Sequence, residues 1–362
     1  MIKLNKIFVC EFITGGGLCA EALPAALASE GALMRDALLR DLSALPYQVY
    51  TTVDARLTMP AYCLCVKVHP SDDIWQIWQT HIAEADAVFL IAPETGGLLH
   101  YLTQLAILQP HSLSVQNSPV KDEYLPVKGK LVLGCGLESI LTTSDKMATY
   151  VALKLAAIAT INTFTADYWI EHEARKEPMT WLAKPNDGAG CEATMCFNDA
   201  ENLIDWLTQN KKQSSHIVQP FQAGTPASIS CVIFEGRARL LSCNKQLIEI
   251  NNHIVSFKGV LVNGMREHWQ AFEQIADSIA KLFPNLAGYV GIDVIVQQNK
   301  MPLNQKLTNQ IVVVEINPRL STSYAGLSES IGVNPAELII NTLTQPDYQW
   351  PMLQQNEVVI RV

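Results

Sequence analysis

The stretch Val312-Val313-Val314-Glu315-Ile316-Asn317-Pro318-Arg319 decides how the rest of this chain is interpreted. It is an apolar run of the kind that forms a buried strand, and it ends in an acid, an amide and an arginine. Side chains two residues apart on a strand share a face, so Glu315, Asn317 and Arg319 are expected to point together. Ile316 is then expected to point into the core.

A second expected strand, Gly288 to Val296, carries one acid, Asp293, among apolar neighbours. Two such strands would bring Asp293 together with Glu315 and Asn317. Hard oxygen ligands of this type suit Mg²⁺ that is held jointly with substrate phosphates. The sequence therefore predicts a metal site, while an acid and an amide that cap an Asn-Pro turn are the simpler alternative.

The composition bounds the class of protein. The chain has 362 residues, enough for two or three domains, with 49% hydrophobic and 17% charged residues. The formal net charge of -9 argues against nucleic acid or an anionic membrane as the main partner, because either would favour a basic face. No stretch approaches the ~20 apolar residues of a membrane helix, and a cytoplasmic location is expected.

The first third alternates strand and helix, which predicts a small α/β domain with a mainly parallel sheet. The expected strands are residues 7–12, 48–53, 63–68 and 87–92, and the expected helices are residues 18–45 and 74–83. Residues 15–20 match G-x-G-x-x-A, yet no second strand ends in an acid at the spacing that a dinucleotide site needs. A tight loop near a ligand is the alternative for this segment.

A composition rich in Pro, Ser, Asn and Gly over residues 109–143 marks a domain boundary. A helix is expected over residues 145–159, capped by Thr143 or Ser144. Beyond Trp181 the pattern favours strands joined by hairpins. The predicted domains are 1–110, an N-terminal α/β domain; 111–180, a linker and helical start; 181–225, a small lid; and 226–362, a C-terminal subdomain with the metal site.

Two lysines are candidates for phosphate binding. Lys184 ends an apolar strand and precedes a small-residue loop that contains Gly188, Ala189 and Gly190. Backbone N–H groups of such a loop can approach phosphate oxygens closely, and a lysine adds charge. Lys146 lies at an expected helix start, where the helix dipole disfavours a cation unless an anion binds nearby. Solvent-exposed lysines are the alternative in both cases.

The strand that ends at Gln219-Pro220-Phe221 breaks at proline and is expected to leave backbone groups free for an adenine edge. A plain transition from strand to loop explains the same pattern. Further along the chain, Lys245 adds a cation that would suit a phosphate or carboxylate.

In chain order these features resemble the ATP-grasp superfamily of carboxylate-amine ligases over residues 110–340. The resemblance implies an α/β protein, α+β in the ligase part, with the ATP-grasp fold after a Rossmann-like preATP-grasp domain. It implies ATP with two Mg²⁺ ions, or Mn²⁺ in their place, small-molecule acid and amine substrates, and room for a homodimer. The implied roles are phosphate binding by Lys146, Lys184 and the loop Gly188, Ala189 and Gly190; adenine binding by Gln219, Pro220 and Phe221; metal binding by Asp293, Glu315 and Asn317; and catalysis by Arg319 and Lys245.

The segments 8–18 and 244–246 are similar to the ATP-grasp ligases of methanofuran biosynthesis. That resemblance implies glutamate as the activated acid and tyramine or tyrosine as the amine, with Ser321 to Tyr324 lining the substrate end or forming a plain polar loop. Three alternatives stay open. They are an ATP-grasp enzyme for another amino acid or carboxylate, a nucleotide-binding regulatory protein without turnover, and a nicotinamide enzyme that uses residues 15–20.

Overall fold

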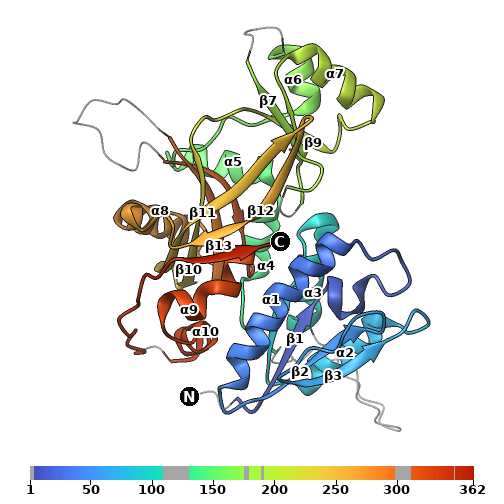
Figure 1. The fold of residues 1–362 in the computed structure, drawn as a ribbon, viewed down its shortest axis with the longest axis vertical. Helices are drawn as coiled ribbons and strands as arrows, with labels where there is room; N and C mark the ends of the chain where they lie inside the picture. Colours follow the sequence, from blue (N-terminus) through green and yellow to red (C-terminus); the bar gives the residue numbers. More distant parts are fainter. Residues whose placement is uncertain (1–3, 109–129, 175–178, 189–190, 298–310, 346) are drawn as a thin grey trace, which may run out of the picture.

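The computed structural model describes residues 4–108, 130–174, 179–188, 191–297, 311–345 and 347–362 (Figure 1). The described residues form two sheets, one with five strands and one with ten. The five-stranded sheet belongs to the N-terminal domain, and the larger sheet belongs to the rest of the chain. The two parts contact each other, for example where Glu94 pairs with Arg319.

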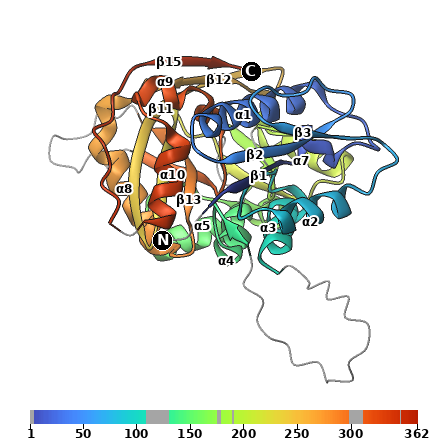
Figure 2. The same ribbon diagram turned by 90° about the horizontal axis from the view of Figure 1, so that it is seen from below.

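The N-terminal domain is a parallel sheet between helices, which confirms the predicted α/β architecture. The strands follow the order β3-β2-β1-β4-β5, and every pair is parallel. They are β1 (Lys6–Glu11), β2 (Gln48–Asp54), β3 (Leu64–Val68), β4 (Ala87–Ile91) and β5 (Leu131–Val132). Figure 2 shows α1 (Ala25–Ser43) on one face and α2 (Ile74–Glu84) and α3 (Leu98–Ile107) on the other.

Alternation along β1 explains this layering. Ile7 and Val9 belong to the same buried cluster as most of the buried apolar residues of α1, whereas Phe8 and Cys10 belong to the cluster that contains the buried residues of α2 and α3. A strand buried on both faces needs apolar residues at every position, as a parallel sheet covered by helices requires.

The expected helix over residues 18–45 begins only at Ala25, which corrects the prediction. Residues Ile13–Gly17 form a short π-helical turn in which Gly16 has φ 107°, and Pro24 is extended at the N-cap of α1. A Cβ on Gly16 would lie 2.8 Å from Val68, so the close approach of the chain to β3 requires glycine there. The glycines therefore form a compact turn, and the helix starts after it.

The larger sheet is mostly antiparallel and runs through two subdomains, with the order β14-β13-β10-β11-β12-β8-β7-β9-β6 and with β15 on β12. Its strands are β6 (Phe164–Thr165), β7 (Trp181–Pro185), β8 (Met195–Phe197), β9 (His216–Pro220), β10 (Thr225–Phe234), β11 (Arg237–Asn251), β12 (Ile254–Val262), β13 (Gly288–Val296), β14 (Ile311–Asn317) and β15 (Val358–Arg361). Its helices are α4 (Leu137–Ser144), α5 (Lys146–Leu155), α6 (Ala166–His172), α7 (Ala200–Gln209), α8 (Trp269–Leu282), α9 (Leu327–Ile331) and α10 (Pro335–Thr344). Short 3₁₀ segments are η2 (Thr95–Gly97), η3 (Arg266–His268) and η5 (Thr322–Gly326).

The small subdomain at the top of Figure 1 has its own core, formed by residues from α6, α7 and β7 to β9. Ala166, Trp169 and Ala174 belong to this core, although the sequence interpretation assigned residues 111–180 to a linker and helical start. Trp169 is fully buried and packs edge to face on Trp181 of β7. The predicted boundary at residues 110 and 111 falls outside the described residues.

The helix expected at residues 145–159 is α5, with a different cap and an earlier end. Asp145 is the N-cap, and its Oδ1 accepts a hydrogen bond of 2.7 Å from the Ala148 amide, so Thr143 and Ser144 do not cap this helix. Those two residues end α4, a helix that the sequence interpretation missed. Ala157 has φ 55°, a left-handed conformation that ends the α5 region before residue 159.

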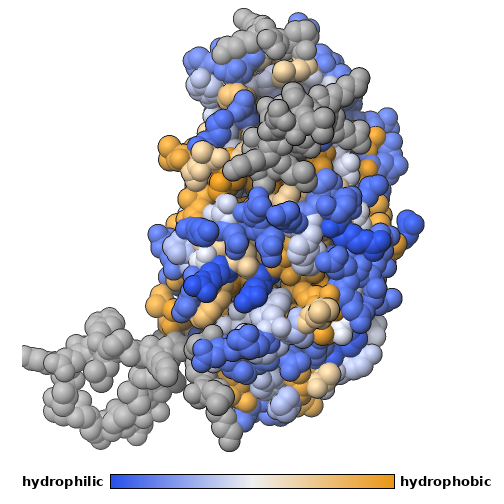
Figure 3. Space-filling view, turned by 90° about the vertical axis from the view of Figure 1, so that its left-hand side faces the viewer, coloured by the Kyte–Doolittle hydropathy of each residue, from blue (hydrophilic) through white to orange (hydrophobic). Residues whose placement is uncertain are grey.

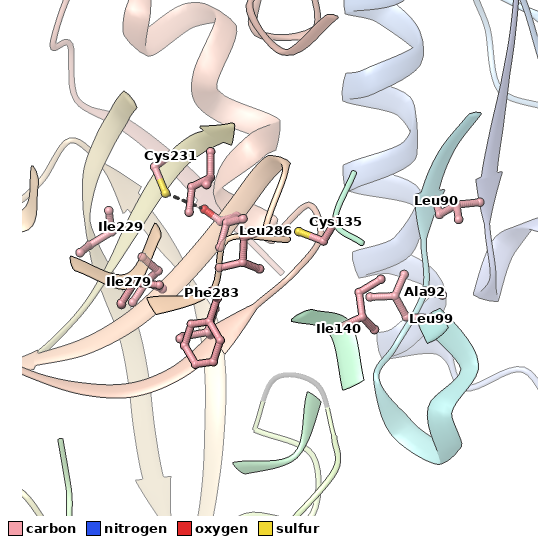
Figure 4. Packing of buried hydrophobic residues seen from close by; sticks show 14 of the residues in the cluster. Leu90, Ala92, Leu99, Cys135, Ile140, Ile229, Cys231, Ile279, Phe283 and Leu286 are labelled. Carbon is pink, nitrogen blue, oxygen red and sulfur yellow. Dashed lines mark hydrogen bonds between the residues drawn. The ribbon is translucent and has the colours of Figure 1, made fainter. Parts of the chain in front are cut away.

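The core continues from one domain to the next. Figure 4 shows Ile279 of α8 and Phe283, which directly follows α8 in the C-terminal subdomain, then Cys135, then Leu99 of α3 in the N-terminal domain, all members of one buried cluster. All nine cysteines lie in the described residues and none is paired there, and most are buried, as expected for core thiols.

The surface is mixed in polarity. On the face shown in Figure 3, hydrophilic side chains predominate and hydrophobic ones gather in small patches. Within the described ranges, no helix combines the length and the apolar character needed to span a membrane.

Candidate active site

Strands β13 and β14 build the acidic part of the site. They pair antiparallel with Asp293 opposite Glu315 and Gly291 opposite Asn317. The register shifts between Asp293 and Val294, where the single extra residue on β14 is Val314. Such a bulge turns a strand locally and changes the direction of its side chains. The three predicted metal ligands are thereby brought to one place, and the Asn317 amide donates to Asp293 Oδ2 at 3.3 Å.

The cavity at this place holds most of the predicted site residues. Its volume is about 300 Å³. Its lining includes Lys184, Gln219, Phe221, Asp293, Glu315, Asn317, Arg319, Ser321, Thr322 and Ser323. The expectation that Glu315, Asn317 and Arg319 share a face while Ile316 enters the core agrees with this geometry, because Ile316 is only 2% exposed.

Two buried lysines face the acids. The Nζ atoms of Lys146 and Lys184 lie 3.8 Å and 3.7 Å from Glu315 Oε2. Burial by itself would raise the pKa of Glu315, but the two lysines lower it, so the Glu315 carboxylate is charged at neutral pH. Burial lowers the pKa of Lys184, and Glu315 opposes that shift.

The Asp293 carboxyl has the opposite tendency. Burial and the nearby charge of Glu315 raise its pKa well above the usual range. Gln246 of β11 donates to Asp293 Oδ1 at 2.8 Å and orients the carboxyl. A cation shared by Asp293 and Glu315 would remove their repulsion.

The donor chemistry of this group fits Mg²⁺. Two carboxylates and an amide supply hard oxygen atoms, and two buried lysines lie beside them. In the part of the chain that the structure describes, no three acids, histidines or cysteines gather as a complete metal cage. Mg²⁺ rarely has such a cage and usually takes one or two carboxylates together with substrate phosphates and water.

The start of α5 is joined to the loop after β7. Asp145 Oδ2 accepts from Asn186 Nδ2 at 2.8 Å, and the Lys146 amide donates to the Asn186 carbonyl at 3.0 Å. The Lys146 Nζ donates to the Gly188 carbonyl at 2.8 Å. Lys146, Lys184 and Gly188 are thus brought together as predicted. Ala189 and Gly190 lie outside the described residues.

Arg319 is held from the other domain. Its Nη2 lies 2.9 Å from Glu94 Oε2, and the two side chains are 8% and 4% exposed. Glu94 follows β4 and precedes η2, where the amide of Gly96 donates to Asp187 Oδ2 at 2.9 Å. The loop after β4 therefore contacts both Arg319 and the loop after Lys184.

The expected hinge lies at the cavity but differs in detail. Gln219 is buried, and its Nε2 donates to Thr163 Oγ1 at 2.8 Å. The amide of Phe221 donates to the Thr180 carbonyl at 2.8 Å, so this backbone group is not free for an adenine edge. Phe221 itself lines the cavity, whereas Pro220 does not.

Lys245 is not brought to the site. It is exposed on β11, between Asn244, which is fully buried, and Gln246, which lines the cavity. Neighbouring residues on a strand point to opposite faces, so Lys245 points away from the cavity. The geometry gives no support to the predicted catalytic role of Lys245, and Gln246 is the residue of this motif that reaches the acids.

Three side chains that line the cavity or contact its residues were not among the predicted site residues, although the loop over residues 93–97 was expected at the ligand-binding edge of the sheet. Glu94 lies in the Pro-Glu-Thr-Gly-Gly loop at the carboxyl end of β4, a position where α/β domains bind ligands, and that position was its available signal. Gln246 could have been found from the alternation of β11. Glu30 lines the cavity from α1, and nothing in its sequence surroundings distinguishes it from other helix-surface acids.

Comparison with known families gives two matches. A model of the ATP-grasp domain matches residues 143–323, and a model of the pre ATP-grasp 3 domain matches residues 47–112. Among curated proteins, the tyramine–L-glutamate ligase of Methanocaldococcus fervens is 27% identical over 255 residues, which is 70% of this chain. The enzyme of the same name from Methanocaldococcus jannaschii is 26% identical over 265 residues, or 73% of this chain. The chain spans 65% of the length of each of these two relatives.

Solved structures share the fold. An ATP-grasp superfamily protein from Archaeoglobus fulgidus has a TM-score of 0.66 at 20% identity, with 99% of each chain covered. The L-amino acid ligase from Bacillus licheniformis has a TM-score of 0.63 at 13% identity, with 98% of this chain and 79% of that chain covered. These likenesses extend across both sheets described above.

Proposed function

The chain belongs to the ATP-grasp family, and from that premise we propose that it is an ATP- and Mg²⁺-dependent carboxylate-amine ligase. The observation that carries the proposal is the convergence of Lys184, Asp293, Glu315, Asn317 and Arg319 on one cavity. Phosphate-binding cations, hard oxygen ligands and an arginine are the groups that phosphoryl transfer requires.

To form an amide from a carboxylate, one carboxylate oxygen must first be converted into a group that leaves more readily than an oxide ion. Transfer of the terminal phosphoryl group of ATP to the carboxylate gives an acyl phosphate and ADP, and attack by the amine then releases phosphate and forms the amide. Both steps depend mainly on positioning and on neutralisation of charge. No nucleophilic side chain of the protein is required.

Different residues at the cavity would bind the nucleotide, the transferred phosphoryl group and the metal. Lys146 and Lys184 would hold the nucleotide phosphates, and Arg319 would contact the phosphoryl group in transit. Asp293, Glu315 and Asn317 would hold Mg²⁺. The fully loaded site would contain two ions, and Mn²⁺ could replace them. The metal would supply charge neutralisation at the phosphates. Gln219 and Phe221 would border the adenine.

The substrates are proposed from the relatives. The two curated relatives are named for joining tyramine and L-glutamate, and we propose glutamate as the activated acid with tyramine or tyrosine as the amine. Ser321, Thr322 and Ser323, next to Arg319, line the cavity and offer hydroxyl groups to a polar substrate. A methanofuran-type cofactor pathway and a cytoplasmic location complete this proposal.

ADP release is the decisive assay. The purified protein is incubated with ATP, Mg²⁺ and paired acids and amines, and ADP and the amide are measured together. We expect both products with glutamate plus tyramine or tyrosine, and a loss of at least ~100-fold in Asp293→Asn and Glu315→Gln. Release with another pair only would replace the substrate assignment, whereas ATP binding without release for any pair would favour a regulatory ATP-binding protein.

A further inference from the structure

The carboxylate of Glu30 lies in the wall of the active-site cavity, although it comes from α1 of the N-terminal domain. Its Oε1 accepts a hydrogen bond of 2.6 Å from Thr322 Oγ1. Arg319 lines the same cavity as Glu30, together with Ser321, Thr322 and Ser323.

Within the described part of the chain, the cations at the cavity are paired with other acids. Arg319 pairs with Glu94, and Lys146 and Lys184 pair with Glu315. Among the described residues, Glu30 forms no ion pair, and its one hydrogen bond to a side chain is the bond from Thr322. A carboxylate has about four acceptor positions, so most of its capacity is available to a ligand.

The helix that carries Glu30 is fixed against both neighbouring parts. A Cβ on the next residue, Gly31, would lie 2.8 Å from Glu11 Oε1, so α1 packs directly on the end of β1. Towards the other end of α1, the Asn334 amide donates to the Asp41 carbonyl at 2.7 Å. A binding group on a rigid, doubly anchored element is positioned precisely.

We propose that Glu30 and Thr322 form a subsite for the ammonium group of an amino acid whose carboxylate is activated beside Arg319. An ammonium group offers three hydrogen-bond donors and one positive charge, which match the unpaired carboxylate of Glu30. The carboxylate of the same amino acid matches Arg319. The inference rests on the proposed ligase function and adds to it a reason for selecting amino acids over simple carboxylic acids.

The acceptor amine is the poorer occupant of this subsite. A nearby carboxylate stabilises the charged form of an amine and raises its pKa. An acceptor amine must be neutral to attack the acyl phosphate, so binding beside Glu30 would suppress the reaction. The ammonium group of the acid substrate stays protonated throughout, and the negative charge of Glu30 stabilises it.

Direct binding tests the subsite without turnover. Calorimetry with the full chain, Mg²⁺ and a non-hydrolysable ATP analogue compares L-glutamate with glutarate, which lacks the ammonium group, and then each other amino acid with its deaminated counterpart. We expect the wild-type protein to bind at least one amino acid ~10- to 100-fold more tightly than its counterpart. Glu30→Gln should abolish this preference, Thr322→Val should weaken it, and the control Glu21→Gln, at an exposed acid, should keep it.

The outcomes separate the subsite from the ligase function. The inference would be overturned if the preference for amino acids over their deaminated counterparts survives Glu30→Gln, or if Glu30→Gln lowers the affinity for both members of each pair equally. It would also be overturned if the wild-type protein binds no amino acid, or if Glu30→Gln changes the binding of tyramine alone. The ATP analogue should bind all variants alike, and thermal unfolding checks that each is folded. ADP release tests the ligase function separately, so either proposal can fail alone.

Discussion

The ion pair between Glu94 and Arg319 connects the N-terminal domain to the proposed phosphoryl-transfer site, and its removal has a predictable result. Arg319 Nη2 and Glu94 Oε2 are 2.9 Å apart, with exposed fractions of 8% and 4%. Arg319 Nε and Glu94 Oε1 are buried and make no hydrogen bond in the structure. One short contact therefore carries most of the connection, and few other groups can replace it.

The magnitude follows from this burial. Glu94→Ala leaves a buried guanidinium without its partner, which costs about 3–5 kcal/mol in the free energy of unfolding when no other group compensates. Arg319 also donates to the Leu320 carbonyl at 3.0 Å, so the lower end is expected. Glu94→Gln keeps an acceptor oxygen and loses only the charge, at a cost of about 1–2 kcal/mol. If Arg319 then shifts from the transferring group, kcat should fall ~10- to 100-fold, since each ~1.4 kcal/mol of barrier is tenfold.

Urea unfolding and steady-state ADP release measure the two effects. Glu84→Gln, an exposed acid of the same domain, is the matched control and should stay within about 0.5 kcal/mol of the wild type. We expect Glu94→Gln to lower kcat with little change in KM for ATP, because in the proposed function Lys146 and Lys184, and not Arg319, would hold the nucleotide. Wild-type stability and kcat in Glu94→Ala would refute the reasoning, and a rise in KM for ATP alone would place Glu94 with nucleotide binding.

Three further predictions concern other parts of the molecule. Lys184→Met should weaken ATP binding ~10-fold or more by loss of a buried phosphate-binding charge, and Lys245→Met should leave it unchanged in the same titration; equal effects would restore a role for Lys245. Burial lowers the pKa of His216 to about 4, with a smaller contribution from a nearby lysine, against 6.5 for the free side chain. His216 is thus neutral when folded and protonates more readily when unfolded, so its stabilisation is complete above pH 6.5 and is lost as the pH falls towards 4. In urea unfolding, the free energy of unfolding of the wild type should fall by about 2 kcal/mol more between pH 7.5 and pH 5 than that of His216→Gln. Equal losses in the two proteins would contradict the pKa shift of His216. Gly31→Ala places a Cβ 2.8 Å from a buried carboxylate oxygen and should cost about 1–3 kcal/mol, whereas Gly134→Ala, whose nearest contact is 3.7 Å away, should cost less; equal unfolding midpoints would show that α1 can move.

The spacing of apolar residues was enough to predict burial for strands whose faces pack against neighbouring elements. The apolar run at β1 and the alternation at Glu315, Asn317 and Arg319 each predicted the burial that the structure has. The same reasoning failed at α4 and at the start of α1, where short helices and glycine turns depend on packing rather than on a long repeat. Lys245 illustrates a related limit, because the position of an isolated cation in a motif does not tell which face of its strand meets the cavity.

By itself the sequence determined the family and the N-terminal α/β domain with its parallel sheet. It also determined the strand that carries Glu315, Asn317 and Arg319, because side-chain spacing along a strand is a local property. Only the tertiary structure decided that Glu94 pairs with Arg319 and that Glu30 enters the cavity. Arg319 and Glu94 are 225 positions apart in the sequence, and Thr322 and Glu30 are 292 positions apart. Contacts over such separations arise from the docking of one domain on another, and no periodicity of either segment encodes them.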